Sequence, residues 1–197
     1  TYIGQDVEAG QDTVILPGTM LQGKTKVGKN CTLGPDTQLT DVICGDGNHL
    51  NRVYAHSCEL GDNNEIGPFV HLRPETCLHN DIKIGNFVEV KNSDVDDGTK
   101  LPHLIYCGDS DLGKNVNFGC GTVTVNFDGK NKHRCTIDEH AFIGCNTNLV
   151  APVHIGARAF TAAGSTITKD VPAKALAVGR AKQVNIENWV KEDTYKD

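Results

Sequence analysis

Apolar residues recur every six positions along most of this chain. Three runs each keep this period, and glycine often follows the apolar residue, as in Ile3-Gly4 and Val27-Gly28. The runs comprise Ile3, Ala9, Ile15, Leu21, Val27, Leu33 and Leu39, then Leu60, Ile66, Leu72, Leu78, Ile84 and Val90, then Ile137, Ile143, Leu149, Ile155, Thr161 and Ile167. A fixed short period of this kind is the mark of a repeat architecture in which stacked units share one core.

The six-residue period predicts an all-β fold, a parallel β-helix of hexapeptide repeats. Each hexapeptide supplies a short strand and a bend, and three of them complete a triangular coil of eighteen residues. The apolar side chain points inward and stacks on its equivalent in the next coil, about 4.8 Å away. We expect this solenoid to span residues 1–172.

The phase ends after Val171-Pro172, and the remaining residues have a different character. We expect residues 173–197 to form an extended arm followed by a short helix over about 185–193. Because the repeat is already under way at the first residues, the sequence suggests one domain of a longer protein.

The period is interrupted in four places, between residues 39 and 60, 90 and 95, 101 and 112, and 118 and 137. Insertions in a solenoid emerge as loops, commonly on a binding face. The first interruption has no recognisable chemistry, and we expect an irregular coil there. The third contains His103 and Tyr106. The fourth is rich in Gly, Asn, Lys and His and is the best candidate for a binding loop.

Composition narrows the function classes. A net charge of −6 argues against non-specific nucleic-acid binding, although a local cationic site for a small anion remains open. No apolar run approaches membrane-spanning length, and no signal peptide is recognisable. The eight cysteines are scattered without a CxxC pair, so we expect free thiols in a cytoplasmic protein and no metal site.

Coil arithmetic suggests two binding features. Arg73 and Lys91 are eighteen residues apart in unbroken phase and should stack on adjacent coils. A phosphate monoester between them would relieve their repulsion; two solvated surface cations are the alternative. Cys145 and Ala163 occupy a second such column, a low strip on which a long, thin ligand could lie, although ordinary small residues at tight bends are the better explanation when the column is taken alone. His103, at a phase interruption, is a candidate proton acceptor, whereas a structural histidine is the alternative.

Several segments resemble one known family in order along the chain. They are "LRPE" (72–75), "GNFVEVK" (85–91), "HLIYCGD" (103–109), "NVNFGCGTVTVNFDGKNKH" (115–133), "NLVAPVHIG" (148–156), "AAGSTITKDVP" (162–172) and "GRAKQVN" (179–185). Together they resemble the C-terminal acetyltransferase domain of the bacterial bifunctional N-acetylglucosamine-1-phosphate uridylyltransferases/glucosamine-1-phosphate acetyltransferases. The resemblance implies a left-handed β-helix that forms a homotrimer with active sites between subunits.

The resemblance also implies a reaction. Acetyl would pass from acetyl-CoA to the amine of glucosamine 1-phosphate, and the product would feed UDP-N-acetylglucosamine synthesis for peptidoglycan. The acetyl transfer would need no metal, because the Mg²⁺-dependent chemistry belongs to the uridylyltransferase half that precedes this region in the family.

The resemblance assigns roles to individual residues. His103 matches the general base; Arg73 and Lys91 match phosphate ligands; Tyr106 and Asn117 match sugar contacts; Asn126, with Phe127 beside it, matches a contact to sugar and acetyl-CoA; Lys132 matches a lysine of the same loop; and Cys120, Cys145, Ala163 and Arg180 match acetyl-CoA contacts. Positions 145, 120 and 127 are commonly Ser, Ala and Tyr in the family. The thiol at 145 puts that contact in doubt, because a thiol is a weaker hydrogen-bond partner than a hydroxyl.

Other functions remain open. An acetyltransferase acting on another amino sugar and a domain that binds acetyl-CoA without turnover are the nearest alternatives. A structural β-helix would need an outward threonine array, which this phase does not give. A metal-dependent hydratase would need converging histidines, which coil arithmetic does not pair.

Overall fold

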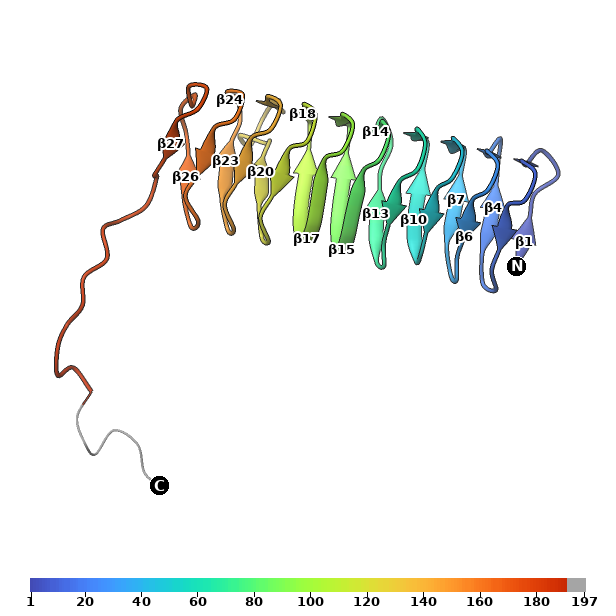
Figure 1. Cartoon of the computed structure of the whole chain (residues 1–197), viewed down its shortest axis with the longest axis horizontal. Coiled ribbons are helices and arrows are strands. Elements are labelled where there is room, and N and C mark those ends of the chain that lie inside the picture. The colour runs from blue at the N-terminus through green and yellow to red at the C-terminus, as the bar shows by residue number, and fades with distance from the viewer. Residues whose placement is uncertain (191–197) are drawn as a thin grey trace.

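The computed structural model describes residues 1–190 and shows one straight, all-β solenoid of about ten turns (Figure 1). The coils form a left-handed parallel β-helix, as predicted. Within residues 1–190 no helix is present, and none is therefore long and apolar enough to cross a membrane. The strands form two hydrogen-bonded sheets of 18 and 9 strands, and every strand ladder is parallel.

The two sheets make three flat faces, which gives the triangular section that the repeat predicts. Face A consists of β3 (Val14–Ile15), β6 (Thr32–Leu33), β9 (His49–Leu50), β12 (Glu65–Ile66), β19 (Asn117–Phe118), β22 (Phe142–Ile143), β25 (Phe160–Thr161) and β27 (Leu176–Ala177). Face B consists of β1 (Tyr2–Ile3), β4 (Met20–Gln22), β7 (Gln38–Thr40), β10 (Val53–His56), β13 (Val70–Leu72), β20 (Val123–Val125), β23 (Asn148–Val150) and β26 (Thr166–Ile167). Two longer strands, β15 (Lys83–Lys91) and β17 (Lys100–Gly108), turn the corner and belong to both faces.

Face C is the 9-stranded sheet. It consists of β2 (Glu8–Ala9), β5 (Lys26–Val27), β8 (Ile43–Cys44), β11 (Glu59–Leu60), β14 (Cys77–Leu78), β16 (Asp94–Val95), β18 (Ser110–Leu112), β21 (Cys135–Ile137) and β24 (Val153–Ile155). The chain passes from face A to face B to face C in each coil, so residues at equivalent places form columns along the axis.

The aliphatic columns fill the interior as the sixfold phase predicts. Leu72 lies opposite Val90 and Leu60 opposite Leu78 on successive coils, and all four are buried. The first coil differs, because Ile3 and Ala9 were expected inside but are exposed. In the described chain only one neighbouring coil covers them, and a solenoid coil needs neighbours to bury its core.

Three of the four interruptions are shortened corners, and only one is a loop. The strand register steps by 17 residues between Lys83 and Lys100 and by 16 between Gln38 and Tyr54. The expectation of an irregular coil over 39–60 was therefore wrong, because β8, β9 and β10 are regular there. A loop around His103 and Tyr106 was also wrong, since both lie within β17. Removing one residue from a corner shifts the phase while the strands keep their ladder.

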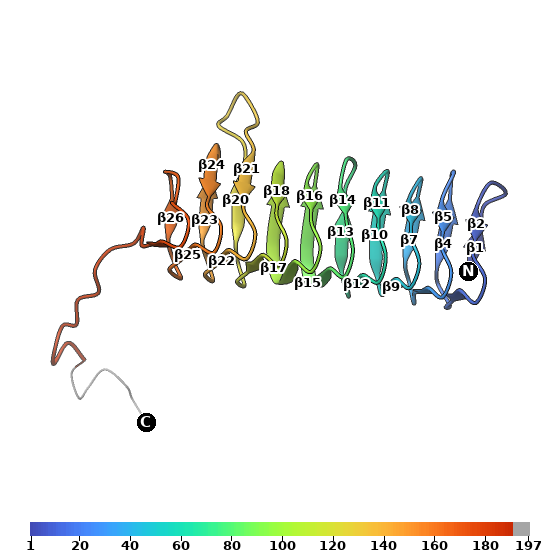
Figure 2. The same cartoon turned by 45° about the horizontal axis from the view of Figure 1, so that its top comes forward.

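The fourth interruption does leave the solenoid. Ser110 pairs with Cys135, a step of 25 residues, and the extra residues project between β20 and β21 (Figure 2). The predicted loop is thus present, at the corner between faces B and C.

The C-terminal segment departs from the prediction. Residues 185–190 form no helix, and 191–193 lie outside the described residues. Trp189 is 72% exposed and so gives a helix no packing support, and isolated short helices are unstable in water. Strand pairing also continues past residue 172, because β27 pairs with β25; the boundary between solenoid and arm stays a prediction.

Candidate active site

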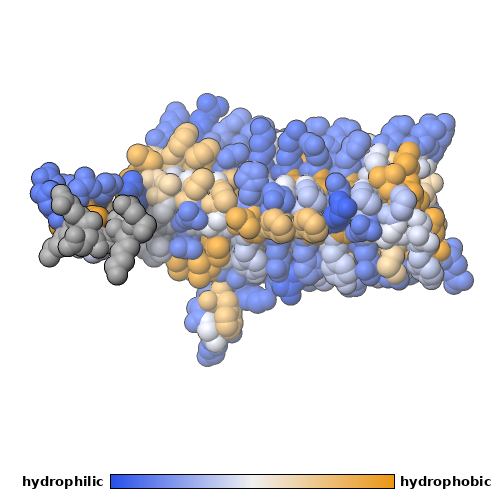
Figure 3. Space-filling view, turned by 90° about the horizontal axis from the view of Figure 1, so that it is seen from below, coloured by the Kyte–Doolittle hydropathy of each residue, from blue (hydrophilic) through white to orange (hydrophobic). Residues whose placement is uncertain are grey.

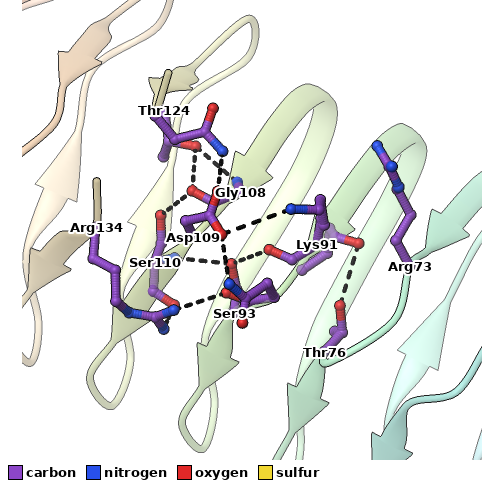
Figure 4. A network of polar contacts seen from close by, with 12 residues as sticks. Arg73, Thr76, Lys91, Ser93, Gly108, Asp109, Ser110, Thr124 and Arg134 are labelled. Atoms are coloured by element: carbon purple, nitrogen blue, oxygen red, sulfur yellow. Dashed lines mark hydrogen bonds and ion pairs between the residues drawn. The ribbon is translucent and has the colours of Figure 1, made fainter. Parts of the chain in front are cut away.

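A row of cations lies at the corner between faces B and C (Figure 4). Arg73 directly follows β13 and Lys91 ends β15, and the pairing of Leu72 with Val90 stacks the two cations on adjacent coils, as the arithmetic predicted. The next place in the column is Gly108, where a Cβ atom would come 2.5 Å from the Tyr106 hydroxyl and 2.7 Å from the Asn126 amide nitrogen. A side chain at this place would displace the Tyr106 hydroxyl and the Asn126 amide, so the glycine leaves room for both groups.

The chain supplies a carboxylate for each of these cations. Arg73 Nη1 lies 2.8 Å from Glu89 Oε1, and this hydrogen-bonded partner raises the pKa of Arg73. Lys91 Nζ lies 3.7 Å from Asp109 Oδ1. The repulsion between Arg73 and Lys91 is therefore already offset within the chain, and it does not by itself require a bound anion.

Asp109 is the residue of this site that the sequence analysis missed. Its carboxylate is buried and accepts hydrogen bonds from the side-chain amides of Asn92, at 2.5 Å, and of Asn126, besides pairing with Lys91. The Asn126 amide also contacts the Tyr106 hydroxyl at 3.2 Å. One buried carboxylate thus holds a lysine and two asparagines at the corner, together with the tyrosine that Asn126 contacts.

The loop brings a third cation to this corner. Phe127 and Lys132 form an antiparallel bridge, so the loop is a small hairpin. The Lys91 amine beside Lys132 lowers the pKa of Lys132, first through hydrogen-bonding contact and then through repulsion. Arg73, Lys91 and Lys132 therefore form one cationic cluster, which we call the cation cluster.

Asp128 holds the hairpin in shape. Its Oδ1 accepts hydrogen bonds from the N–H groups of Asn131 at 2.6 Å and Lys130 at 2.7 Å, and its Oδ2 lies 2.7 Å from His133 Nε2. These partners, the Asn131 N–H first, lower the pKa of Asp128 to about 2. The charged form of Asp128 is thus part of the folded loop.

His103 lies at the other edge of face B. It pairs with Asn86 across β15 and β17, and its Nδ1 lies 3.2 Å from Asn86 Oδ1. Leu104 then turns the corner with φ of 51°, and the four residues 105–108 cross face B, a width of about 13 Å at 3.3 Å per residue. His103 and the cation cluster of the same chain are therefore a full face apart.

Asn117 lies on the same side as His103. Both side chains border a hollow of about 270 Å³ on face A, together with Lys100 and Pro102. The structure therefore groups Asn117 with His103 and separates it from Tyr106 and Asn126.

The predicted small-residue strip begins at His103. Register places Cys120 beyond His103, Cys145 beyond Cys120 and Ala163 beyond Cys145, one coil at a time. Two main-chain hydrogen bonds connect the coils at the corner that follows. The Asn146 N–H donates to Cys120 O at 2.7 Å, and the Gly164 N–H donates to Cys145 O at 2.8 Å.

The strip offers hydrogen-bond donors. Within residues 1–190, the peptide N–H groups of Cys120, Cys145 and Ala163 donate to no other main-chain oxygen. At its far end the side chain of Arg180 approaches Gly164, with Cδ 3.9 Å from where a Cβ would stand. The strip thus has a basic group at one end, His103 at the other and free donors between.

Comparison with known proteins identifies close relatives. No protein-family model matches the chain. It is 53% identical to the bifunctional protein GlmU of Geobacillus sp. (strain WCH70) over 190 residues, 96% of this chain and 41% of that protein. It is 56% identical to that of Caldanaerobacter subterraneus subsp. tengcongensis over 192 residues, 98% of this chain and 42% of that protein. The chain spans about two fifths of the length of these relatives.

Solved structures agree on the fold alone. A UDP-N-acetylglucosamine acyltransferase from Campylobacter jejuni superposes with a TM-score of 0.54 at 16% identity, covering 90% of this chain and 69% of that one. An Arabidopsis UDP-N-acetylglucosamine acyltransferase gives 0.50 at 13% identity, with the same coverage. The close relatives carry the comparison: nearly the whole of this chain is similar to bifunctional GlmU proteins, over a share of their length consistent with their C-terminal acetyltransferase domain.

Proposed function

We propose that this chain transfers acetyl from acetyl-CoA to the amine of glucosamine 1-phosphate, in a homotrimer whose active sites lie between subunits. The observation that carries the proposal is the division of the candidate residues between the two edges of face B. The cation cluster with Tyr106 and Asn126 lies at one edge, whereas His103 and the small-residue strip lie at the other. The similarity to bifunctional GlmU proteins supports the reaction.

The cation cluster suits the phosphate of the acceptor. Arg73 can grip two phosphate oxygens, and Lys91 and Lys132 add point charges. The Tyr106 hydroxyl and the Asn126 amide, 3.2 Å apart, offer partners for the sugar hydroxyls. The Asp109 carboxylate keeps the Lys91 amine and the Asn126 amide in position.

The small-residue strip suits acetyl-CoA. A long, thin thioester can lie along Cys120, Cys145 and Ala163 because their side chains are small and their N–H groups lack main-chain acceptors. Arg180 at the far end would pair with a phosphate of the coenzyme. Phe127, exposed on the loop, adds an apolar contact.

An apolar row on the edge of face B supports the homotrimer (Figure 3). Phe69, Phe87 and Leu104 are each more than half exposed and have φ values of 60°, 59° and 51°. This left-handed conformation is unfavourable for bulky residues. The row borders a groove of about 820 Å³ that reaches Tyr106. A second copy on this surface would cover the row and bring its own cation cluster to His103.

His103 acts as the general base in this proposal. An amide oxygen only accepts, so Nδ1 donates to Asn86 Oδ1 and Nε2 keeps its lone pair for a proton. Nε2 takes a proton from the C2 ammonium, and the freed amine attacks the thioester carbonyl. Peptide N–H groups at Cys120 or Ala163 stabilise the oxyanion. Its collapse expels coenzyme A as the thiolate, which takes up the second proton that the attacking nitrogen releases and leaves as the thiol. No acyl-enzyme forms.

The proposal places the reaction in amino-sugar metabolism. The product, N-acetylglucosamine 1-phosphate, would serve UDP-N-acetylglucosamine synthesis for peptidoglycan in the cytoplasm. The acetyl transfer uses side chains and peptide groups without a metal; Mg²⁺ would serve only the uridylyltransferase part of the relatives.

Coenzyme A release tests the reaction and the base together. The chain is assayed with acetyl-CoA and glucosamine 1-phosphate beside His103→Ala, with His49→Ala, an exposed strand histidine, as the control. We expect turnover that falls about a hundredfold or more in His103→Ala and not in the control. Turnover that survives His103→Ala discards the base, and no turnover from a folded trimer discards the reaction.

A further inference from the structure

Three metal-ligating side chains meet on the outer side of face C. Cys77 of β14 lies directly opposite Asp94 of β16 on the adjacent coil. His79 follows Cys77 by two residues and so points to the same side of the strand, with inward Leu78 between them. The thiol, imidazole and carboxylate ligand atoms all lie within 4.8 Å of one another, and His79 Nε2 is 3.0 Å from Asp94 Oδ1.

We propose that Cys77, His79 and Asp94 bind one divalent transition-metal ion of the zinc class and so clip two adjacent coils together. Zinc takes sulfur at about 2.3 Å and nitrogen or oxygen at about 2.0–2.2 Å, so tetrahedral donors stand about 3.3–3.7 Å apart. The donors here reach that spacing by side-chain shifts of about 1 Å. Binding displaces the thiol proton to solvent, and water takes the fourth position.

A neighbouring group of the same kind is less suited to a metal. His79 also lies near Asp96 and Asp97. Asp97 already accepts hydrogen bonds from Lys114 Nζ and from the Asn80 N–H, both at 3.0 Å. Asp96 Oδ1 accepts the Asp97 N–H at 2.8 Å. These carboxylates are engaged and the group lacks a thiol.

The ligands of the proposed site are free by comparison. Within residues 1–190, the Cys77 thiol makes no hydrogen bond, and the Asp94 carboxylate has His79 as its one hydrogen-bonded partner. A thiolate, an imidazole and a carboxylate together favour zinc over magnesium or calcium, which prefer oxygen ligands.

The surroundings favour a cation. The site borders a groove of about 620 Å³ whose lining includes Asp94, Asp96, Asp111, Asp138 and Glu139, with one lysine, Lys114. Burial of the Cys77 thiol raises its pKa, and the negative charges of Asp94 and Glu59 raise it further. A metal ion reverses that effect, because its positive charge favours the thiolate.

The site could not be read from spacing along the chain. No CxxC or HxxxH pair is present; the pattern is Cys-x-His with an aspartate 17 residues after the cysteine. Only the register of one shortened coil brings the aspartate opposite the thiol. The inference is independent of the proposed acetyl transfer, because none of its ligands serves there.

Cobalt titration of the reduced, chelator-stripped chain tests the site. Co²⁺ bound to a thiolate gives a charge-transfer band in the near ultraviolet, and Zn²⁺ should displace it. We expect saturation at one equivalent per chain, loss of the band in Cys77→Ser, and affinity more than about tenfold weaker in Asp94→Asn. The thermal unfolding midpoint should rise with Zn²⁺ in the wild type but not in Cys77→Ser.

Two variants serve as matched controls. His154 and Asp138 form a similar pair on face C, 2.9 Å apart, and Asp96→Asn alters the neighbouring group. His154→Gln and Asp96→Asn should titrate like the wild type. Circular dichroism checks that each variant is folded. A band that persists in Cys77→Ser, or the lack of a one-equivalent endpoint in the wild type, would overturn the proposal.

Discussion

Replacing the buried carboxylate of Asp109 tests how the cation cluster is held. Asp109→Asn keeps the shape of the side chain, but an amide nitrogen then replaces one oxygen. Lys91 Nζ and the Asn92 amide both point to Oδ1, and the Asn126 amide points to Oδ2. Whichever oxygen is replaced, at least one buried donor faces another donor.

The expected loss of folding free energy depends on how deeply the carboxylate is buried rather than on the length of its ion pair. An unsatisfied buried donor costs about 1–3 kcal/mol, and the remaining bonds lose about 1 kcal/mol when their acceptor becomes neutral. We therefore expect Asp109→Asn to lower the free energy of unfolding by about 2–4 kcal/mol. The Glu65–Lys83 pair is shorter, 2.9 Å against 3.7 Å, but both its side chains are more than 60% exposed. Glu65→Gln should cost about 0–1 kcal/mol.

Urea unfolding of both variants, followed by circular dichroism, measures the difference. A free energy of unfolding that is well below the wild-type value in Asp109→Asn, but close to it in Glu65→Gln, supports the reasoning. If Glu65→Gln loses as much stability as Asp109→Asn, distance outweighs burial at these sites and the account of Asp109 is wrong.

Further predictions concern the loop, the strip and the subunit contact. Because folding lowers the pKa of Asp128 to about 2, its charge stabilises the loop above the unfolded pKa of about 3.9, and this stabilisation is lost as the pH falls toward 2. Amide exchange at Lys130 and Asn131, expressed relative to the intrinsic rate at each pH, should therefore accelerate over that range. An unchanged ratio would refute the role of Asp128. Cys145→Ser should lower the KM for acetyl-CoA about two- to tenfold, the value of one hydroxyl hydrogen bond, whereas an unchanged KM would mean that only the main chain makes this contact. Phe87→Asn suits a φ of 59° better than Phe, so it should leave the fold intact but shift the trimer toward monomer in analytical ultracentrifugation; an unshifted trimer would exclude the apolar row as the subunit contact.

The sequence predicted the solenoid because most inward positions follow a six-residue period within long runs. Leu72 and Val90 follow from it, and so does the stacking of Arg73 on Lys91. The interruptions were harder, because a missing corner residue and an inserted loop both break the phase. Tyr106 is an example: we predicted a loop near it, but the interruption is a shortened corner and Tyr106 lies in a strand.

Other features depend on contacts that spacing does not carry. The role of Asp109 could not be predicted from its place after glycine in "HLIYCGD". Its carboxylate is held by Asn92 and Asn126 from neighbouring coils. Glu89 became the partner of Arg73 across a diagonal between coils. The helix expected near Trp189 is absent from residues 185–190, and the 72% exposure of Trp189 leaves little packing to support one.

The most direct test of the central claim mixes two inactive variants. His103→Ala lacks the base and Lys91→Ala lacks part of the cation cluster, so each homotrimer should be inactive. If the base and the cluster at one site come from different subunits, random mixed trimers at equal amounts contain intact sites at about one quarter of the interfaces. We predict that refolding the two chains together restores about a quarter of wild-type coenzyme A release. No activity above that of the separate variants, with mixed trimers shown to form, would place the whole site within one chain and contradict the account.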